Sequence, residues 1–367
     1  MNQSPRPGPP APPERHGNAS RGRRWHRVAL VAAAAAVLAA GGLAAAWAAG
    51  GTAPARSPRA ERPTATPGRT PTPRPAAPQS LAVGTIGAYP VAQQELVFVD
   101  RSRDSLGPLA LPTLVRYPVI PAAAGAATSG RLARGLFPLV VFAPGFAQCQ
   151  ASYAALLRTW ASAGYVVAGV NFPRTNCHVA SPNENDLVNQ PADLAYVIAR
   201  MLAASRRPGG FLAGLIDPAK IAVAGHSDGG DTVAALAANT CCRDPAVTAA
   251  IVLAGAEWPP MGGSWFTRPA PPILFVQGDA DDINPPAASV TMYQHDTSGP
   301  RFYLDLLGAG HLPPYEDRGP AELVVARVTV DFLDRYLAGS PAAAAAMRHD
   351  AHVAGIAAMT SGSQPPP

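Results

Sequence analysis

The sequence predicts an α/β fold with a mostly parallel sheet and helices on both faces. From about residue 95, short apolar runs rich in β-branched residues alternate with longer stretches whose apolar residues recur at helical spacing. The short runs carry few polar residues, as expected for strands that are covered on both sides. Glycine-rich and polar loops follow several of these runs, at the sheet edge where open α/β proteins place their sites.

The elements follow one another along the chain in a regular alternation. Glu95–Asp100 and Leu114–Val119 are predicted to open the sheet as neighbouring strands, since no helical stretch separates them. Pro191 marks a helix start, because proline is well tolerated in a first turn. The other predicted strands are 139–143, 165–170, 221–225, 249–255, 272–278 and 301–307, and the predicted helices are 152–164, 191–205, 228–239, 287–295 and 321–337.

Composition divides the chain into five segments. They are a basic N-terminal stretch (1–27), an apolar segment (28–51), a linker rich in Pro and Thr (52–80), a folded domain (81–340) and a C-terminal tail (341–367). The linker has no apolar periodicity and is expected to be extended and disordered. The tail ends in SGSQPPP and is expected to be partly disordered.

The apolar segment 28–51 follows several arginines and is long enough to cross a bilayer as a helix. Two interpretations remain open: an uncleaved signal anchor, which the length of the run favours, and a cleavable export signal with small residues near 47–49. The pair Arg23-Arg24 is a weak signal for twin-arginine export. A buried helix is disfavoured because proline-rich segments lie on both sides. Either export route predicts a domain outside the cytoplasm, anchored to the membrane or secreted.

Charge is distributed unevenly. Residues 1–80 contain eleven Arg and two Glu, a net charge of +9, whereas the remainder has 18 basic and 22 acidic residues, a net charge of −4. The region after residue 80 therefore lacks the basic surface that binds phosphate backbones, and no nucleic-acid partner is predicted.

The four cysteines permit disulfides if the chain is exported. Cys149 and Cys177 both follow apolar strands, in loops expected at one edge of the sheet, so they are candidates to pair. For the adjacent Cys241 and Cys242, the sequence leaves two states open: a disulfide that closes a tight ring, or two free thiols. No grouping of Cys and His has zinc spacing, so no metal site is predicted.

Ser227 is the candidate nucleophile. It lies in AVAGHSDGG, where Gly-x-Ser-x-Gly follows a predicted strand and starts a predicted helix, as the nucleophile-elbow motif requires. Glycines two residues to either side remove side chains that would collide with the neighbouring strand and helix. The helix dipole favours negative charge beside the serine. The alternative is a glycine-rich loop in which Gly-x-Ser-x-Gly occurs by chance. The position of the motif between a predicted strand and a predicted helix favours the nucleophile elbow over such a loop.

A serine hydroxyl needs a base, and the base needs a third group to orient it. Asp281 lies in GDADDINPP after one predicted strand, and His311 lies in GAGH after the next. The order Ser227, Asp281, His311 is the one this motif predicts. Asp282 and Asp279 are alternatives for the acid, with Asp281 favoured.

Two backbone N–H groups are predicted to form the oxyanion hole. One belongs to Asp228, the residue after the nucleophile, and the other to Phe146 in FAPGFAQ, the loop after an earlier strand. A packed core aromatic is the alternative role for Phe146. His226, which precedes the nucleophile, is expected to point away from it.

Four motifs together resemble the α/β-hydrolase superfamily: GHSDGG, APGF with ASYAALLRTWASAGYVV, GDADDINP and GAGH. The resemblance runs from about Glu95 to Leu337 and is greatest to exported esterases with little or no lid. These are polyester hydrolases of the bacterial cutinase type, and the platelet-activating-factor acetylhydrolase, chlorophyllase and dienelactone hydrolase relatives. It implies that Phe146 and Trp258 contact the ester.

Three positions depart from those relatives. Asp228 stands where the cutinase-type enzymes usually have Met, and Phe146 stands where Tyr is common. The nucleophile is Ser, whereas dienelactone hydrolase itself has Cys.

The resulting prediction is a serine esterase that forms an acyl-enzyme and needs no cofactor. The connection that starts with AGAEW and ends before the strand at Pro272 has about eighteen residues (254–271), too few for a lid of several helices. An open cleft suits esters on a bulky or hydrophobic body. The same three residues would also serve other enzymes: a lipase or phospholipid acetylhydrolase, an amidase, or a thioesterase. The alternative from another class is a non-catalytic surface binding protein.

Overall fold

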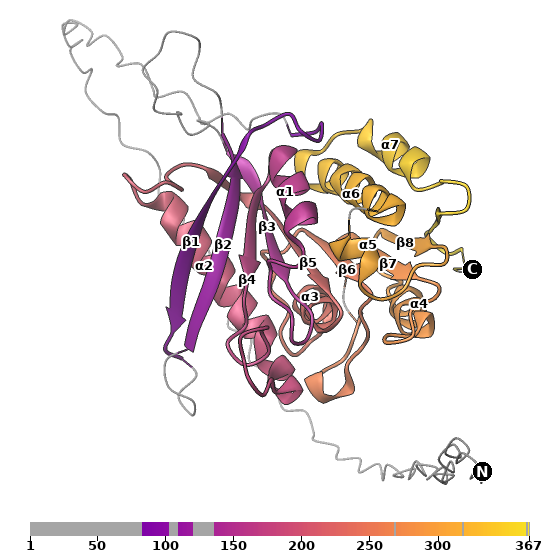
Figure 1. Cartoon of the computed structure of the whole chain (residues 1–367), viewed down its shortest axis with the longest axis horizontal. Coiled ribbons are helices and arrows are strands. Elements are labelled where there is room, and N and C mark those ends of the chain that lie inside the picture. Colours follow the sequence, from indigo (N-terminus) through magenta and orange to yellow (C-terminus); the bar gives the residue numbers. More distant parts are fainter. Residues whose placement is uncertain are drawn as a thin grey trace, which may run out of the picture. The chain divides into compact units, whose positions relative to one another are not determined.

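The computed structural model describes residues 83–364, apart from 103–108, 120–135, 268 and 318, and also describes residue 366. The described residues form a nine-stranded sheet in the order β1-β2-β4-β3-β5-β6-β7-β8-β9 (Figure 1). Strands β4, β3, β5, β6, β7 and β8 run parallel, while β1, β2 and β9 are antiparallel to their neighbours. The strands are β1 (Val91–Asp100), β2 (Leu109–Pro118), β3 (Phe137–Ala143), β4 (Val166–Val170), β5 (Ile216–His226), β6 (Ala249–Leu253), β7 (Ile273–Gly278), β8 (Arg301–Leu306) and β9 (Ala357–Ser361).

Helices cover both faces of this sheet. Helices α2, α3 and α4 contribute Leu194, Val233 and Met292 to one buried core, and α1 and α6 contribute Trp160 and Val325 to the core on the other face. Strands β3, β4, β6 and β7 are therefore buried along their whole length. This arrangement confirms the predicted fold class. The helices are α1 (Ala154–Ser162), α2 (Gln190–Arg206), α3 (Asp228–Ala238), α4 (Pro286–His295), α5 (Pro313–Glu316), α6 (Pro320–Leu333) and α7 (Ala343–Asp350).

The C-terminal region differs from the prediction of a tail from residue 341. It contains α7 and β9, and β9 pairs with β8 through Leu304 and Met359. Met347 and Ala357 are buried in the core that contains α6. The folded region therefore extends beyond residue 340, because apolar residues of this segment complete the core.

The predicted basic stretch 1–27, the apolar segment 28–51 and the linker 52–80 lie outside the described residues. Their assignments stay predictions. Within the part of the chain that the structure describes, no helix combines the length and apolar character needed to cross a membrane.

Two disulfides form. Cys149 bonds Cys177, with the two Cα atoms 5.3 Å apart, inside the usual range for such a bridge. This bond joins the loop after β3 to the loop after β4. Cys241 bonds its neighbour Cys242 just after α3. All four cysteines are thus paired.

Candidate active site

Ser227 lies at a sharp turn between β5 and α3. Its backbone has φ 55° and ψ −124°, a region that is costly for any residue with a side chain. A Cβ at Gly225 would lie 2.1 Å from the carbonyl oxygen of Gly229, and a Cβ at Gly229 would lie 2.0 Å from that of Ala143. Both glycines are therefore required by the close approach of strand and helix. This is the turn geometry that the sequence predicts for a nucleophile elbow.

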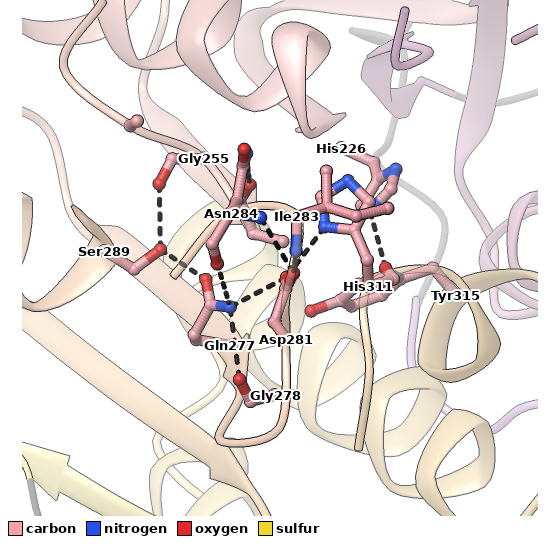
Figure 2. A network of polar contacts seen from close by, with 12 residues as sticks. His226, Gly255, Gln277, Gly278, Asp281, Ile283, Asn284, Ser289, His311 and Tyr315 are labelled. Carbon is pink, nitrogen blue, oxygen red and sulfur yellow. Dashed lines mark hydrogen bonds and ion pairs between the residues drawn. The ribbon is translucent and has the colours of Figure 1, made fainter. Parts of the chain in front are cut away.

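His311 and Asp281 meet in loops that follow neighbouring strands, β8 and β7. The Nδ1 atom of His311 lies 2.7 Å from Oδ2 of Asp281, and both residues are buried (Figure 2). The other carboxylate oxygen accepts the N–H groups of Ile283 at 2.9 Å and Asn284 at 2.8 Å. A carboxylate at Nδ1 keeps the proton on that nitrogen, which leaves Nε2 free to act as a base.

The structure distinguishes the three aspartates that the sequence offers as partners of His311. Asp281 is the one that contacts His311. The carboxylate of Asp279 instead accepts the N–H of Gly308 at 2.6 Å, and Asp282 is exposed.

Gln277 is a site residue that sequence reasoning missed. Its side-chain N–H donates to Oδ2 of Asp281 at 2.9 Å, and its carbonyl oxygen accepts the hydroxyl of Ser289 at 2.7 Å (Figure 2). The fully buried Gln277 therefore holds the carboxylate that orients His311. The signal was available as the single polar side chain in the apolar strand ILFVQG.

One small cavity contains both Ser227 and His311. Its volume is about 200 Å³, and its apolar wall comes from Phe146, Ile283 and Leu312. The wall is polar where these two residues lie and apolar around them, which suits an ester with a hydrophobic body. Gly145, Gln148 and His226 complete the lining.

The two residues predicted to form the oxyanion hole are Asp228, directly after Ser227, and Phe146, which shares the cavity with Ser227. Asp228 is the first residue of α3, so its N–H has no partner inside the helix. Phe146, in the loop after β3, lines the cavity.

The carboxyl group of Asp228 is unusual for its position. It is 9% exposed, and its Oδ2 atom is buried with no hydrogen-bond partner among the described residues. Burial, and then the charge of Glu184, raise the pKa of Asp228 from 3.8 to about 7. Burial also raises the pKa of Asp231, one turn further along α3, whose carboxylate accepts the N–H of Ala256 at 2.6 Å. Two acidic groups whose pKa is raised by burial therefore lie in the first turn of α3, directly after Ser227.

Trp258 is not among the residues that line this cavity. It packs on a small buried cluster of Leu187, Ala235 and Met261. Its substrate contact stays a prediction. The connection between β6 and β7 that carries it forms, in its described residues, one short 3-10 helix, Pro259–Met261, so no helical lid arises there.

Cys149, Cys177 and His178 lie close enough together to resemble a metal site. Both sulfur atoms belong to the same disulfide, and only a thiolate binds metal. This grouping therefore has no metal-binding chemistry in the oxidised protein.

Comparison with known proteins extends the geometric findings. The family model described as PET hydrolase-like matches residues 124–342. The bis(hydroxyethyl) terephthalate hydrolase of Streptomyces coelicolor is 30% identical over 205 residues, which are 55% of this chain and 58% of the relative, so the match spans little more than half of that protein. The segment matched by the family model contains Phe146, Ser227, Asp281 and His311 and covers more than half of the chain. The chain therefore belongs to the PET hydrolase-like family of the α/β-hydrolase superfamily.

Proposed function

We propose that the protein is a serine hydrolase that cleaves carboxylic esters, with Ser227 as nucleophile, His311 as base and Asp281 as the acid that orients it. The observation that carries this proposal is the 2.7 Å contact between His311 Nδ1 and Asp281 Oδ2, beside a cavity that His311 shares with Ser227. The strained backbone of Ser227 supports it, because strain of this kind is retained where function needs it.

The reaction proceeds in two halves. Nε2 of His311 takes the proton of the Ser227 hydroxyl as its oxygen attacks the ester carbonyl carbon, and the resulting oxyanion accepts the N–H groups of Phe146 and Asp228. Each such donor contributes roughly 3 kcal/mol. The imidazolium then protonates the leaving alcohol, and an acyl-enzyme remains. Water gives a proton to His311 as it attacks the acyl carbon. The bond between that carbon and the Ser227 oxygen then breaks, His311 returns its proton to this oxygen, and the acid is released.

We propose that the natural substrates are esters on a bulky or aromatic body. The Streptomyces relative is named as a hydrolase of a terephthalate diester. The apolar wall of the cavity supports the same class here, since Ile283 is 61% exposed beside Phe146 and Leu312. A ligand ring can lie against such a wall without a lid having to open.

A fluorophosphonate probe tests the reaction class. We expect the native protein to be labelled and Ser227→Ala to be unlabelled, with equal thermal stability showing that the variant is folded. Absence of labelling in the native protein would reject the serine hydrolase and favour a binding protein on this scaffold.

Substrate series test the narrower proposal. Initial rates on p-nitrophenyl esters from acetate to laurate, on bis(hydroxyethyl) terephthalate, and on the matched anilides and thioesters should show hydrolysis of short and aromatic esters. A maximum at long acyl chains would indicate a lipase, and activity confined to anilides or to thioesters would indicate an amidase or a thioesterase.

We also propose that the domain works outside the cytoplasm, held to the membrane by segment 28–51 or released after its cleavage. The apolar composition of this segment supports export, and so do two disulfides, which persist in oxidising compartments. Fractionation of cells that express the full chain tests this: the protein should appear with membranes or in the medium, and deletion of 28–51 should return it to the cytosol. A cytosolic full-length protein would contradict export.

A further inference from the structure

A buried chain of hydrogen bonds connects three loops at the active site. The N–H of Gly145 donates to the hydroxyl of Tyr153 at 3.3 Å, this hydroxyl lies 2.9 Å from Nδ1 of His226, and Nε2 of His226 lies 2.9 Å from the carbonyl oxygen of His311. Figure 2 shows the last of these contacts, with His226 beside the His311 turn. The side chains of Tyr153 and His226 have no exposed surface, so water does not compete for these bonds.

The two ends of the chain determine the direction of every bond in it. The carbonyl of His311 can only accept, so Nε2 of His226 must carry a proton. A neutral imidazole has one N–H, so its Nδ1 must accept, and Tyr153 must donate to it. The oxygen of Tyr153 is then free to accept the N–H of Gly145. Each donor therefore meets an acceptor, and one tautomer of His226 is selected.

Burial keeps His226 in this neutral form. Burial, and then the charge of His311, lower the pKa of His226 to about 3, and burial raises the pKa of Tyr153 so that its hydroxyl stays protonated. The two imidazole rings lie 4.6 Å apart. A charged His226 would oppose the positive charge that His311 gains during catalysis, so a neutral neighbour is what the reaction needs.

The His311 turn needs an anchor of its own. It follows β8 through Gly308, which has φ +68°, and Gly310, so the local backbone is intrinsically permissive. Asp281 holds the His311 side chain, whereas His226 holds its backbone. Because His226 precedes Ser227 in the chain, the same residue ties the base to the nucleophile turn.

We propose that His226 is a positioning residue for the catalytic base: its Nε2–H holds the His311 backbone at a constant distance from Ser227, and Tyr153 maintains the tautomer that makes this possible. This inference rests on the proposed function. It predicts that loss of the N–H donor at the Nε2 position lowers turnover more than loss of the volume of the ring does.

The test compares His226→Gln with His226→Asn in the full-length protein. The side-chain nitrogen of Gln reaches the place of Nε2 and keeps a donor for the His311 carbonyl. The shorter side-chain amide of Asn reaches the place of Nδ1, so it keeps a partner for the Tyr153 hydroxyl but loses the donor to the His311 carbonyl. Both amides are smaller than the ring and each retains one of its two bonds, so a role in packing alone predicts similar losses.

We expect kcat on p-nitrophenyl acetate to fall about 100-fold in His226→Asn and about 10-fold or less in His226→Gln, because a small misplacement of a catalytic group has effects of this size. KM should stay within about two-fold, since binding of the ester does not use this bond. The rate of fluorophosphonate labelling should fall in the same order. Equal kcat values for the two variants would overturn the proposal.

Two tyrosine variants give an independent test if the His226 variants do not fold. Tyr153→Phe removes a hydroxyl inside the chain, whereas Tyr315→Phe removes an equally buried hydroxyl that bonds the carbonyl of Val276 while its ring lies 4.7 Å from that of His226. Both should lower the thermal midpoint, but we expect kcat to fall, by about 10-fold, only in Tyr153→Phe. Equal kcat values for Tyr153→Phe and Tyr315→Phe would overturn the proposal. A native protein that no fluorophosphonate labels would reject the proposed function instead, which is a separate result.

Discussion

Replacement of Asp228 by Asn should stabilise the protein in a manner that depends on pH. The Asp228 carboxyl is 9% exposed, and its buried Oδ2 has no hydrogen-bond partner among the described residues. Burial, followed by the charge of Glu184, raises its pKa from 3.8 to about 7. The folded protein therefore holds this proton more tightly than the unfolded chain does.

The sign and size of the effect follow from this difference. Stability contributed by the protonated carboxyl is present in full below pH 3.8 and is lost as the pH rises to about 7. Each pKa unit corresponds to about 1.4 kcal/mol, so the full penalty above pH 7 is about 4 kcal/mol. Asn also buries a polar group without a complete set of partners, so we expect about 2 kcal/mol of this penalty to be recovered.

Urea unfolding at pH 5 and pH 8 measures the difference. Asp228→Asn should raise the free energy of unfolding at pH 8 by about 2 kcal/mol, and by clearly less at pH 5. Glu95→Gln, on the exposed side of β1, is the matched control and should change neither value. The variant should also gain kcat/KM relative to the native protein as the pH rises through 7, because an ionised carboxylate beside Ser227 opposes the oxyanion. An equal stability change at both pH values would refute the reasoning.

Three further changes have clear expected outcomes. Asp281→Asn should lower kcat about 10⁴-fold in ester hydrolysis because His311 would favour the wrong tautomer; a near-native rate would contradict its role. Ser227→Gly should be about 1 to 2 kcal/mol more stable to urea than Ser227→Ala because glycine tolerates the φ of 55°, and equal stabilities would mean that the turn is unstrained. Replacing Cys149 and Cys177 by Ala should lower the free energy of unfolding by about 3 kcal/mol, since their bond closes a long loop, whereas an unchanged midpoint would indicate that the bond does not form.

Local sequence signals were sufficient for the fold class, and they also pointed to Ser227, Asp281 and His311 as candidate site residues. Strands such as β3 and β7 are apolar throughout because both faces are covered, and this composition is visible without coordinates. The turn at Ser227 was predictable because Gly225 and Gly229 follow a steric rule that acts within a few residues. The C-terminal boundary was missed because β9 gains its stability from pairing with β8, a partner that precedes it by some fifty residues in the sequence.

The sequence by itself determined the alternation of strands and helices, the elbow at Ser227, and the set of three aspartates among which Asp281 was favoured. Only the tertiary structure decided which acid reaches His311, that Gln277 holds this acid, and that Tyr153 and the His311 backbone are joined through His226. The physical reason is the range of the interactions. Periodicity and turn sterics act between near neighbours, whereas a hydrogen bond between residues 73 or 85 positions apart exists only once the sheet has brought its loops to one edge.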